Sequence, residues 1–128
     1  SSLVTGVQTC ALPIWQDLQT ALSFDSATTF DVSNAETTIV TTTGYYRLFT
    51  SMNITGSVVC KIIVDDGTSQ KDLYTVVGGT GSTIFQTIDV NIFNPAGYSI
   101  ILKTTASAGR WLGNIRQIAD IEGNLTNP

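Results

Sequence analysis

Histidine is absent from this 128-residue chain, and cysteine occurs only at Cys10 and Cys60. The common structural and catalytic zinc sites are built mainly from these two residue types, so the sequence excludes them. A cysteine nucleophile also needs an activating base, most often histidine, which the chain lacks. Cys60 lies in the apolar run SVVCKIIV, where we expect a small buried side chain. We predict no disulfide, no metal and no cofactor.

Charge and long apolar runs are also scarce. Charged residues make up 12% of the chain, about half the usual share. The net charge is −4 and the six basic residues are scattered singly, so there is no basic stripe to neutralise phosphates. No apolar run approaches the roughly 20 residues of a membrane helix. We therefore expect a soluble domain with neither a nucleic-acid nor a membrane partner.

Threonine, in contrast, occurs twenty times, and Gly, Ser and Asn fill the gaps between short apolar runs. This composition, with alternating apolar and polar positions, is typical of all-β proteins. Turn sequences such as Asp66-Gly67, 78–81 and 94–97 separate the runs. The predicted fold is an antiparallel β-sandwich (jelly roll) of about eight strands, at 28–32, 37–42, 45–54, 58–64, 71–77, 83–93, 98–104 and 110–118.

The period-2 pattern also assigns side chains to faces, because neighbours along a strand point to opposite sides. The expected core residues are Tyr46, Leu48, Met52, Ile54, Val58, Cys60, Ile62, Val64, Ile84, Ile88, Val90, Ile92, Ile100 and Leu102. The expected outward residues are Tyr45, Phe49, Val59, Ile63, Phe85, Phe93 and either Trp111 or Leu112. So many outward apolar side chains favour a covering subunit, or else a thicker core or closed barrel that encloses them.

The start of the chain has a different character. Residues Val4 to Ile14, VTGVQTCALPI, match the in-frame translation of a common sequencing adapter, which includes Cys10. We therefore interpret 1–14 as adapter-derived and expect a metagenomic origin. The remaining chain divides into a β-sandwich domain at 15–118 and a tail at 119–128. This polar tail loses the strand pattern, so it is either a frayed end or a docking arm.

Several blocks carry a family resemblance. Gly44-Tyr45-Tyr46 opens an apolar strand after a Thr-rich segment, and STIFQTIDVN (82–91), NPAGYSI (94–100) and RWLGNI (110–115) follow. In this order the blocks resemble strands of the trimeric jelly rolls of the tumour-necrosis-factor and complement-globular-head type. The resemblance covers about residues 30–118 and is one of pattern, since Gly97-Tyr98 stands where the family usually has Gly-Asp.

This resemblance implies a homotrimer in which each sandwich turns an aromatic face to the three-fold axis. Candidate interface residues, chosen because the alternation places most of them off the core, are Tyr45, Phe49, Phe85, Phe93 and Trp111. Viral fibres and capsid-decoration proteins reuse this module. We therefore predict a phage virion structural protein of the capsid-decoration or fibre type, located in the virion, which assembles with its own copies and other virion proteins.

A second hypothesis is a glycan- or receptor-binding tip domain of a phage fibre or a secreted adhesin. It would gain if Trp15, Tyr74, Tyr98 or Trp111 were exposed beside polar side chains, because aromatic rings stack on sugars. Packing of the same rings at a subunit contact would favour assembly instead.

The motifs that could indicate catalysis lack the residues that such chemistry requires. Gly79-Thr80-Gly81 has neither the third glycine nor the following helix of a nucleotide loop. Asp65-Asp66-Gly67 lacks the spacing of a calcium loop and reads as a hairpin turn. The carboxylates of Asp65, Asp72 or Asp89 could form the catalytic pair of a glycosidase only if the strands bring them together. We predict a protein that is not an enzyme.

Overall fold

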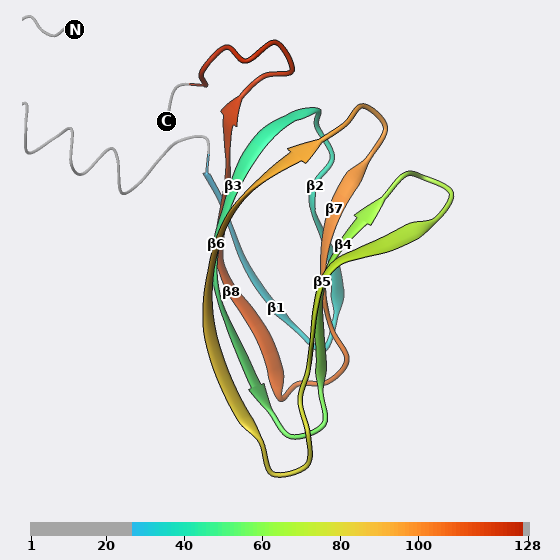
Figure 1. The fold of residues 1–128 in the computed structure, drawn as a ribbon, viewed down its shortest axis with the longest axis vertical. Helices are drawn as coiled ribbons and strands as arrows, with labels where there is room; N and C mark the ends of the chain where they lie inside the picture. Colours follow the sequence, from blue (N-terminus) through green and yellow to red (C-terminus); the bar gives the residue numbers. More distant parts are fainter. Residues whose placement is uncertain (1–26, 127–128) are drawn as a thin grey trace, which may run out of the picture.

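The computed structural model describes residues 27–126 as two four-stranded antiparallel sheets packed face to face (Figure 1). The prediction for residues 1–14 lies outside this range. The strands are β1 (Ala27–Ser33), β2 (Glu36–Val40), β3 (Gly44–Thr55), β4 (Val59–Asp65), β5 (Gln70–Val77), β6 (Thr83–Asn94), β7 (Ser99–Thr104) and β8 (Gly109–Ala119). The predicted all-β sandwich of eight strands is confirmed.

The strand order follows a nested pattern. One sheet has the order β1-β8-β3-β6 and the other β2-β7-β4-β5. The strands therefore pair from the two ends of the chain towards its middle: β1 with β8, β2 with β7, β3 with β6 and β4 with β5. This order is that of an eight-stranded jelly roll. The sheet containing β1, β8, β3 and β6 is called the first sheet below, and its partner the second sheet. Strands β6 and β5, one from each sheet, are both edge strands.

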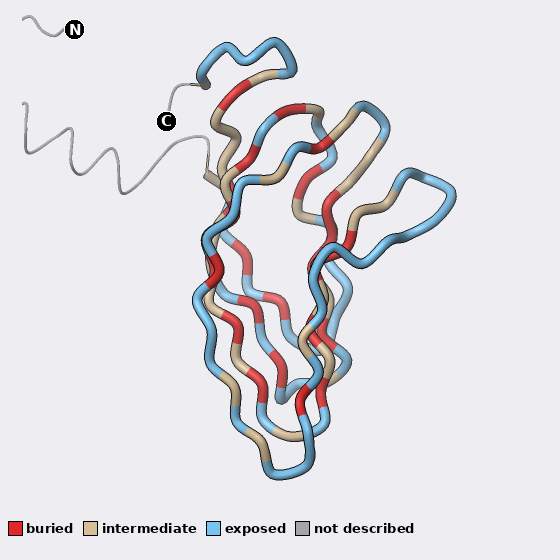
Figure 2. Tube along the Cα trace, viewed as in Figure 1, coloured by how far each residue is buried: buried red, intermediate tan, exposed pale blue. Residues whose placement is uncertain are grey.

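The core lies between the sheets, where inward-facing positions of both are buried (Figure 2). Leu48, Met52 and Ile54 of β3 alternate with more accessible neighbours, as the period-2 pattern predicts. Two assignments differ from expectation. Val90, expected in the core, is 40% exposed because β6 is an edge strand, and Ile63, expected outside, is buried opposite Ile101 in the second sheet.

Trp111 is the largest fully buried side chain, and its indole Nε1 donates a hydrogen bond to the Lys103 carbonyl oxygen at 3.1 Å. Gly113, two residues after Trp111 on β8, lies opposite Thr50 of β3. A Cβ on Gly113 would overlap the Phe49 carbonyl oxygen and the Thr50 side chain. Glycine is therefore required there by the close approach of the two strands.

Asn94 ties two loops together at one end of the sandwich. Its side chain is fully buried, and Nδ2 donates to the carbonyl oxygens of Thr42 and Tyr98, each at 3.0 Å. The Tyr46 hydroxyl donates to the same Thr42 oxygen at 2.8 Å. The predicted reversal after Asn94 is present and is closed by the Tyr98 amide donating to the Pro95 carbonyl. Among residues 27–126, no helix is long and apolar enough to cross a membrane.

A candidate assembly face

The outer surface of the first sheet carries a row of exposed apolar side chains. Strands β3 and β6 place Tyr45 opposite Phe93 and Asn53 opposite Phe85, which fixes three of the rings on one face. Phe49 follows on the same face of β3, and Leu112 lies on the adjacent β8. We call this surface the aromatic face; its members and exposed fractions are Tyr45 (40%), Phe49 (44%), Phe85 (71%), Phe93 (39%) and Leu112 (45%).

Four of the five predicted interface residues lie on this face, and Trp111 does not. Trp111 is 0% exposed within a single subunit, so it has no surface to offer a partner, and that assignment was wrong. Leu112 takes the outward position, which the sequence left open as the alternative. The register explains this: Trp111 pairs with Val32 of β1 and Met52 of β3, and all three point into the core.

Two ion pairs flank the rings, each joining neighbouring strands. Arg47 binds Asp89 through two hydrogen bonds of 2.8 and 2.7 Å, and Arg110 binds Asp31 in the same way at 2.7 and 2.6 Å. The Arg47 guanidinium also lies 5.4 Å from the centre of the Phe49 ring. Such two-pronged pairs fix both side chains and neutralise both charges locally. The charges of these two ion pairs therefore add no net charge to the aromatic face, which suits a protein partner.

The ion pairs also shift the titration of their acids. Hydrogen bonds from Arg110 hold the pKa of Asp31 below its ordinary value, and those from Arg47 do the same for Asp89. Both carboxylates therefore stay charged further into the acid range than free side chains would. The pattern of paired charges persists at mildly acidic pH.

The rings contact one another along the face. Tyr45 and Phe93 have ring centres 4.7 Å apart with planes tilted by 42°, within the range of favourable aromatic pairs. Taking about 200 Å² for each large side chain, the exposed part of the row amounts to about 480 Å². That is within the range of the largest apolar patch on a typical monomer, a patch that is often functional.

The acidic residues singled out in the sequence have structural roles. Asp65 accepts the Gly67 amide, and Asp66 accepts the amides of Thr68 and Ser69, so these two form the predicted hairpin turn. Asp72 pairs with Lys61 on the second sheet, whereas Asp89 lies on the outer face of the first. Asp72 and Asp89 therefore face away from each other. Within residues 27–126, no three acidic or cysteine side chains gather where they could hold a metal ion.

Cys60 is a free, fully buried thiol, as its apolar strand position predicted. Burial raises its pKa to about 11, so the thiolate that would react is scarce at neutral pH. The Gly79-Thr80-Gly81 sequence forms a connection between β5 and β6, closed by the Ser82 amide donating to the Gly79 carbonyl. It is the plain inter-strand loop expected from its missing glycine.

Comparison with known proteins shows a similarity to phage capsid proteins. No family model matches the chain, and no curated protein matches it. Solved structures do match, and two of them are crystal structures of a pentameric capsid protein isolated from metagenomic phage sequences, each with a TM-score of 0.72 and 28% identity to this chain. The match covers 98% of this chain and 83% or 87% of the other.

The similarity to these neighbours shows that the chain has a structural role in a phage virion and is located in the virion. They do not extend to the tumour-necrosis-factor and complement-head families, so that resemblance stays at the level of strand pattern. The three-fold symmetry that it implied has no support among them, because the neighbours are pentameric.

Proposed function

We propose that the protein is a capsid component of a tailed phage, which assembles into a closed ring of identical subunits in which the aromatic face of each subunit packs against a different surface of its neighbour. The observation that carries the proposal is the row of rings on the first sheet, exposed in one subunit and flanked by charges that neutralise each other. Apolar rings with locally paired charges are the composition of a protein–protein contact. The pentameric neighbours favour five copies and a capsid position, in the shell or decorating it, over a fibre.

The side chains that could support catalysis, which lie mostly outside the aromatic face, also favour assembly without chemistry. The acidic side chains discussed above are engaged in turns and ion pairs, and the Cys60 thiol is buried with a raised pKa. We propose that the protein is not an enzyme and that it acts by surface complementarity with its own copies and with other capsid proteins.

The glycan-binding alternative rests on Tyr74. Its ring is 39% exposed and its hydroxyl donates to Gln86 at 2.6 Å, a polar neighbour of the kind that sugar sites use. Trp111 is buried and unavailable, and Tyr98 is half-buried. Binding of the full chain to a glycan array, lost on Tyr74→Ala, would support this alternative; an array without signal would remove it.

The mass of the full chain in solution tests the assembly proposal. Five copies of the 13.7 kDa chain have a mass of about 68 kDa, and the trimer implied by the family resemblance about 41 kDa. Analytical ultracentrifugation from nanomolar to micromolar concentration would distinguish these masses. A species of 13.7 kDa throughout that range would overturn the proposal.

A further inference from the structure

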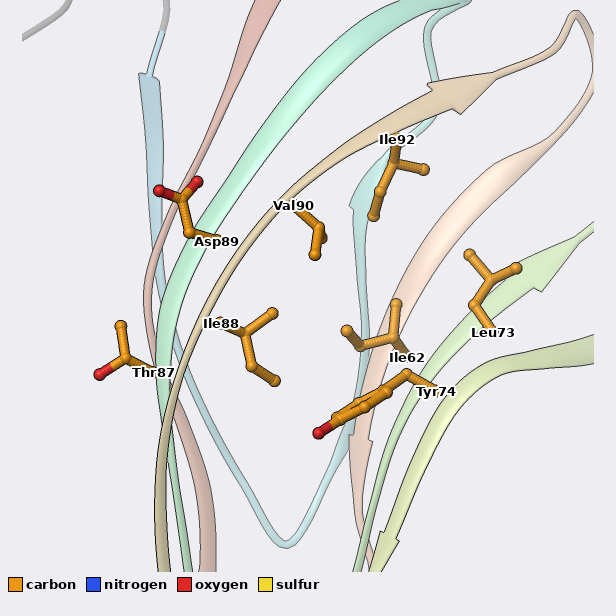
Figure 3. A pocket seen from close by; sticks show the side chains of 8 residues that line it. All are labelled: Ile62, Leu73, Tyr74, Thr87, Ile88, Asp89, Val90 and Ile92. Atoms are coloured by element: carbon orange, nitrogen blue, oxygen red, sulfur yellow. The ribbon is translucent and has the colours of Figure 1, made fainter.

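A second apolar surface lies on the open side of the sandwich. Between the edge strands β5 and β6 is a groove of about 410 Å³. Figure 3 shows Ile88, Val90 and Ile92 of β6 pointing towards Leu73 and Tyr74 of β5, with Ile62 of β4 between them. We call this the β5–β6 groove.

The groove is open in a single subunit. Leu73 is 49% exposed, Tyr74 39% and Val90 40%, although all three line it. The hydrogen bond from the Tyr74 hydroxyl to Gln86 joins the two sheets at this side at 2.6 Å. The groove therefore has an accessible apolar lining, and this hydrogen bond joins its two walls, which is the form of a binding site and not of a collapsed core.

A third apolar feature is the end of the chain. After β8 the backbone turns back, with a bridge between Ala119 and Leu125. The Asp120 carboxylate accepts the amides of Glu122 and Asn124, each at 2.9 Å, and fixes the turn. We call residues 119–126 the arm. It holds Ile121 and Leu125 out into solvent, at 59% and 87% exposed.

Symmetry connects the groove to the arm. A ring with an odd number of subunits cannot be built from contacts that pair a patch with itself, and needs two different surfaces that fit each other. The groove is concave and apolar, and the arm is a projecting turn that carries two aliphatic side chains. We propose that the arm of one subunit docks in the β5–β6 groove of the next copy, with Leu125 and Ile121 against Leu73 and Val90. This inference rests on the proposed ring and names a contact that closes it.

Charge is complementary across this contact. Four of the six basic residues form ion pairs within the subunit, and Arg116 has an interaction of its own. Lys71, two residues before Leu73 on β5, is the remaining basic residue and forms no ion pair within residues 27–126. The arm carries Glu122, an exposed acid in the same turn as Ile121. The two surfaces proposed to meet therefore carry charges of opposite sign near them, an acid on the arm and a base on β5.

Engineered disulfides test the contact in the full chain, with Cys10→Ser in every variant. The double variant Leu73→Cys, Leu125→Cys is expected to give, under mild oxidation, a ladder of linked subunits on a non-reducing gel that ends at the ring size. Val77→Cys with Leu125→Cys is the matched control, because Val77 is 67% exposed on β5 and does not line the groove. A ladder no stronger than the control overturns the proposal, and so does a cross-linked monomer, which would mean that the arm docks on its own subunit.

Dissociation supplies an independent measurement. Leu125→Ser is expected to raise the midpoint concentration of ring dissociation about tenfold, whereas Val77→Ser leaves it unchanged. A wild-type chain that is monomeric throughout would overturn the proposed function itself. A wild-type ring with an unchanged midpoint in Leu125→Ser would overturn only the docking of the arm.

Discussion

Phe49→Ser is expected to dissociate the ring and leave the subunit folded. Phe49 is 44% exposed near the middle of the aromatic face, so about 90 Å² of its ring is available to a partner. At about 25 cal/mol per Å², covering that area contributes about 2 kcal/mol to each contact. The substitution should therefore weaken each contact about thirty-fold.

The subunit itself should lose little. Phe49 points away from the core, and the Arg47 guanidinium lies 5.4 Å from the centre of its ring, a stacking worth about 0.5 to 1 kcal/mol at exposed sites. Urea unfolding of the dissociated subunit would measure this cost, and sedimentation over a concentration series would measure the midpoint of dissociation. Val77→Ser, which removes an exposed aliphatic side chain from the second sheet, is the control.

One result would refute the reasoning directly. If Phe49→Ser is folded and its dissociation midpoint equals that of the wild type, the aromatic face is not the contact. A midpoint concentration that rises equally in the Val77→Ser control would show a general surface effect and also remove the argument.

Four further outcomes follow from the fold. Gly113→Ala should lower the free energy of unfolding by about 1 to 3 kcal/mol in urea titration, since a Cβ there overlaps β3; an unchanged value would contradict the close approach. Asn94→Ala should cost about 2 kcal/mol in the same assay, because the Tyr98 carbonyl oxygen loses its Asn94 donor and the Thr42 oxygen keeps only the Tyr46 hydroxyl, and a neutral result would remove the role of Asn94 in joining the loops. The pKa values of Asp31 and Asp89 are lowered in the folded state, so the stability that their ion pairs contribute is complete above the ordinary pKa near 3.8 and is lost as pH falls through the lowered pKa values of the folded state. Arg47→Met removes the partner of Asp89 and should therefore flatten the decline of the melting temperature below pH 4. A pH profile identical to that of the wild type would contradict the Arg47–Asp89 ion pair. In the Cys10→Ser chain, Cys60 should react with a thiol reagent at neutral pH only after unfolding, since its pKa is about 11, and rapid labelling of the native protein would contradict its burial.

Local alternation was sufficient to predict the strands because most carry a clear period-2 pattern between turn residues. In β3 the buried positions Leu48, Met52 and Ile54 recur at the predicted spacing, and the predicted strand at 45–54 differs from the observed one by a residue at each end. The pattern failed at Trp111. The inward positions of β8 are Trp111, Gly113 and Ile115, and the glycine interrupts the series of apolar side chains that would have indicated the face. Counting back from Ile115 would have placed the indole in the core.

The groove could not be predicted from the sequence. Val90 has the spacing of a core residue and does face inwards, yet it is exposed because β6 lies at a sheet edge. Edge position depends on which strands pair across the whole chain, and a local pattern carries no information about that. The arm had a usable signal, since Asp120 precedes a Gly-Asn pair of the kind that closes turns.

Strand β6 links the two proposed contacts. Its outward residues Phe85 and Phe93 belong to the aromatic face, and its inward residues Val90 and Ile92 line the groove. Because neighbouring residues on a strand point to opposite sides, a substitution at one position can alter one surface and leave the other intact. Phe85→Ser and Val90→Ser lie on the same strand and differ mainly in the face they change, so their effects on ring dissociation separate the contribution of the sheet contact from that of the arm. If the two contacts are independent, the effects of these substitutions should add in the double variant, whereas a shared contact would make them fall short of the sum.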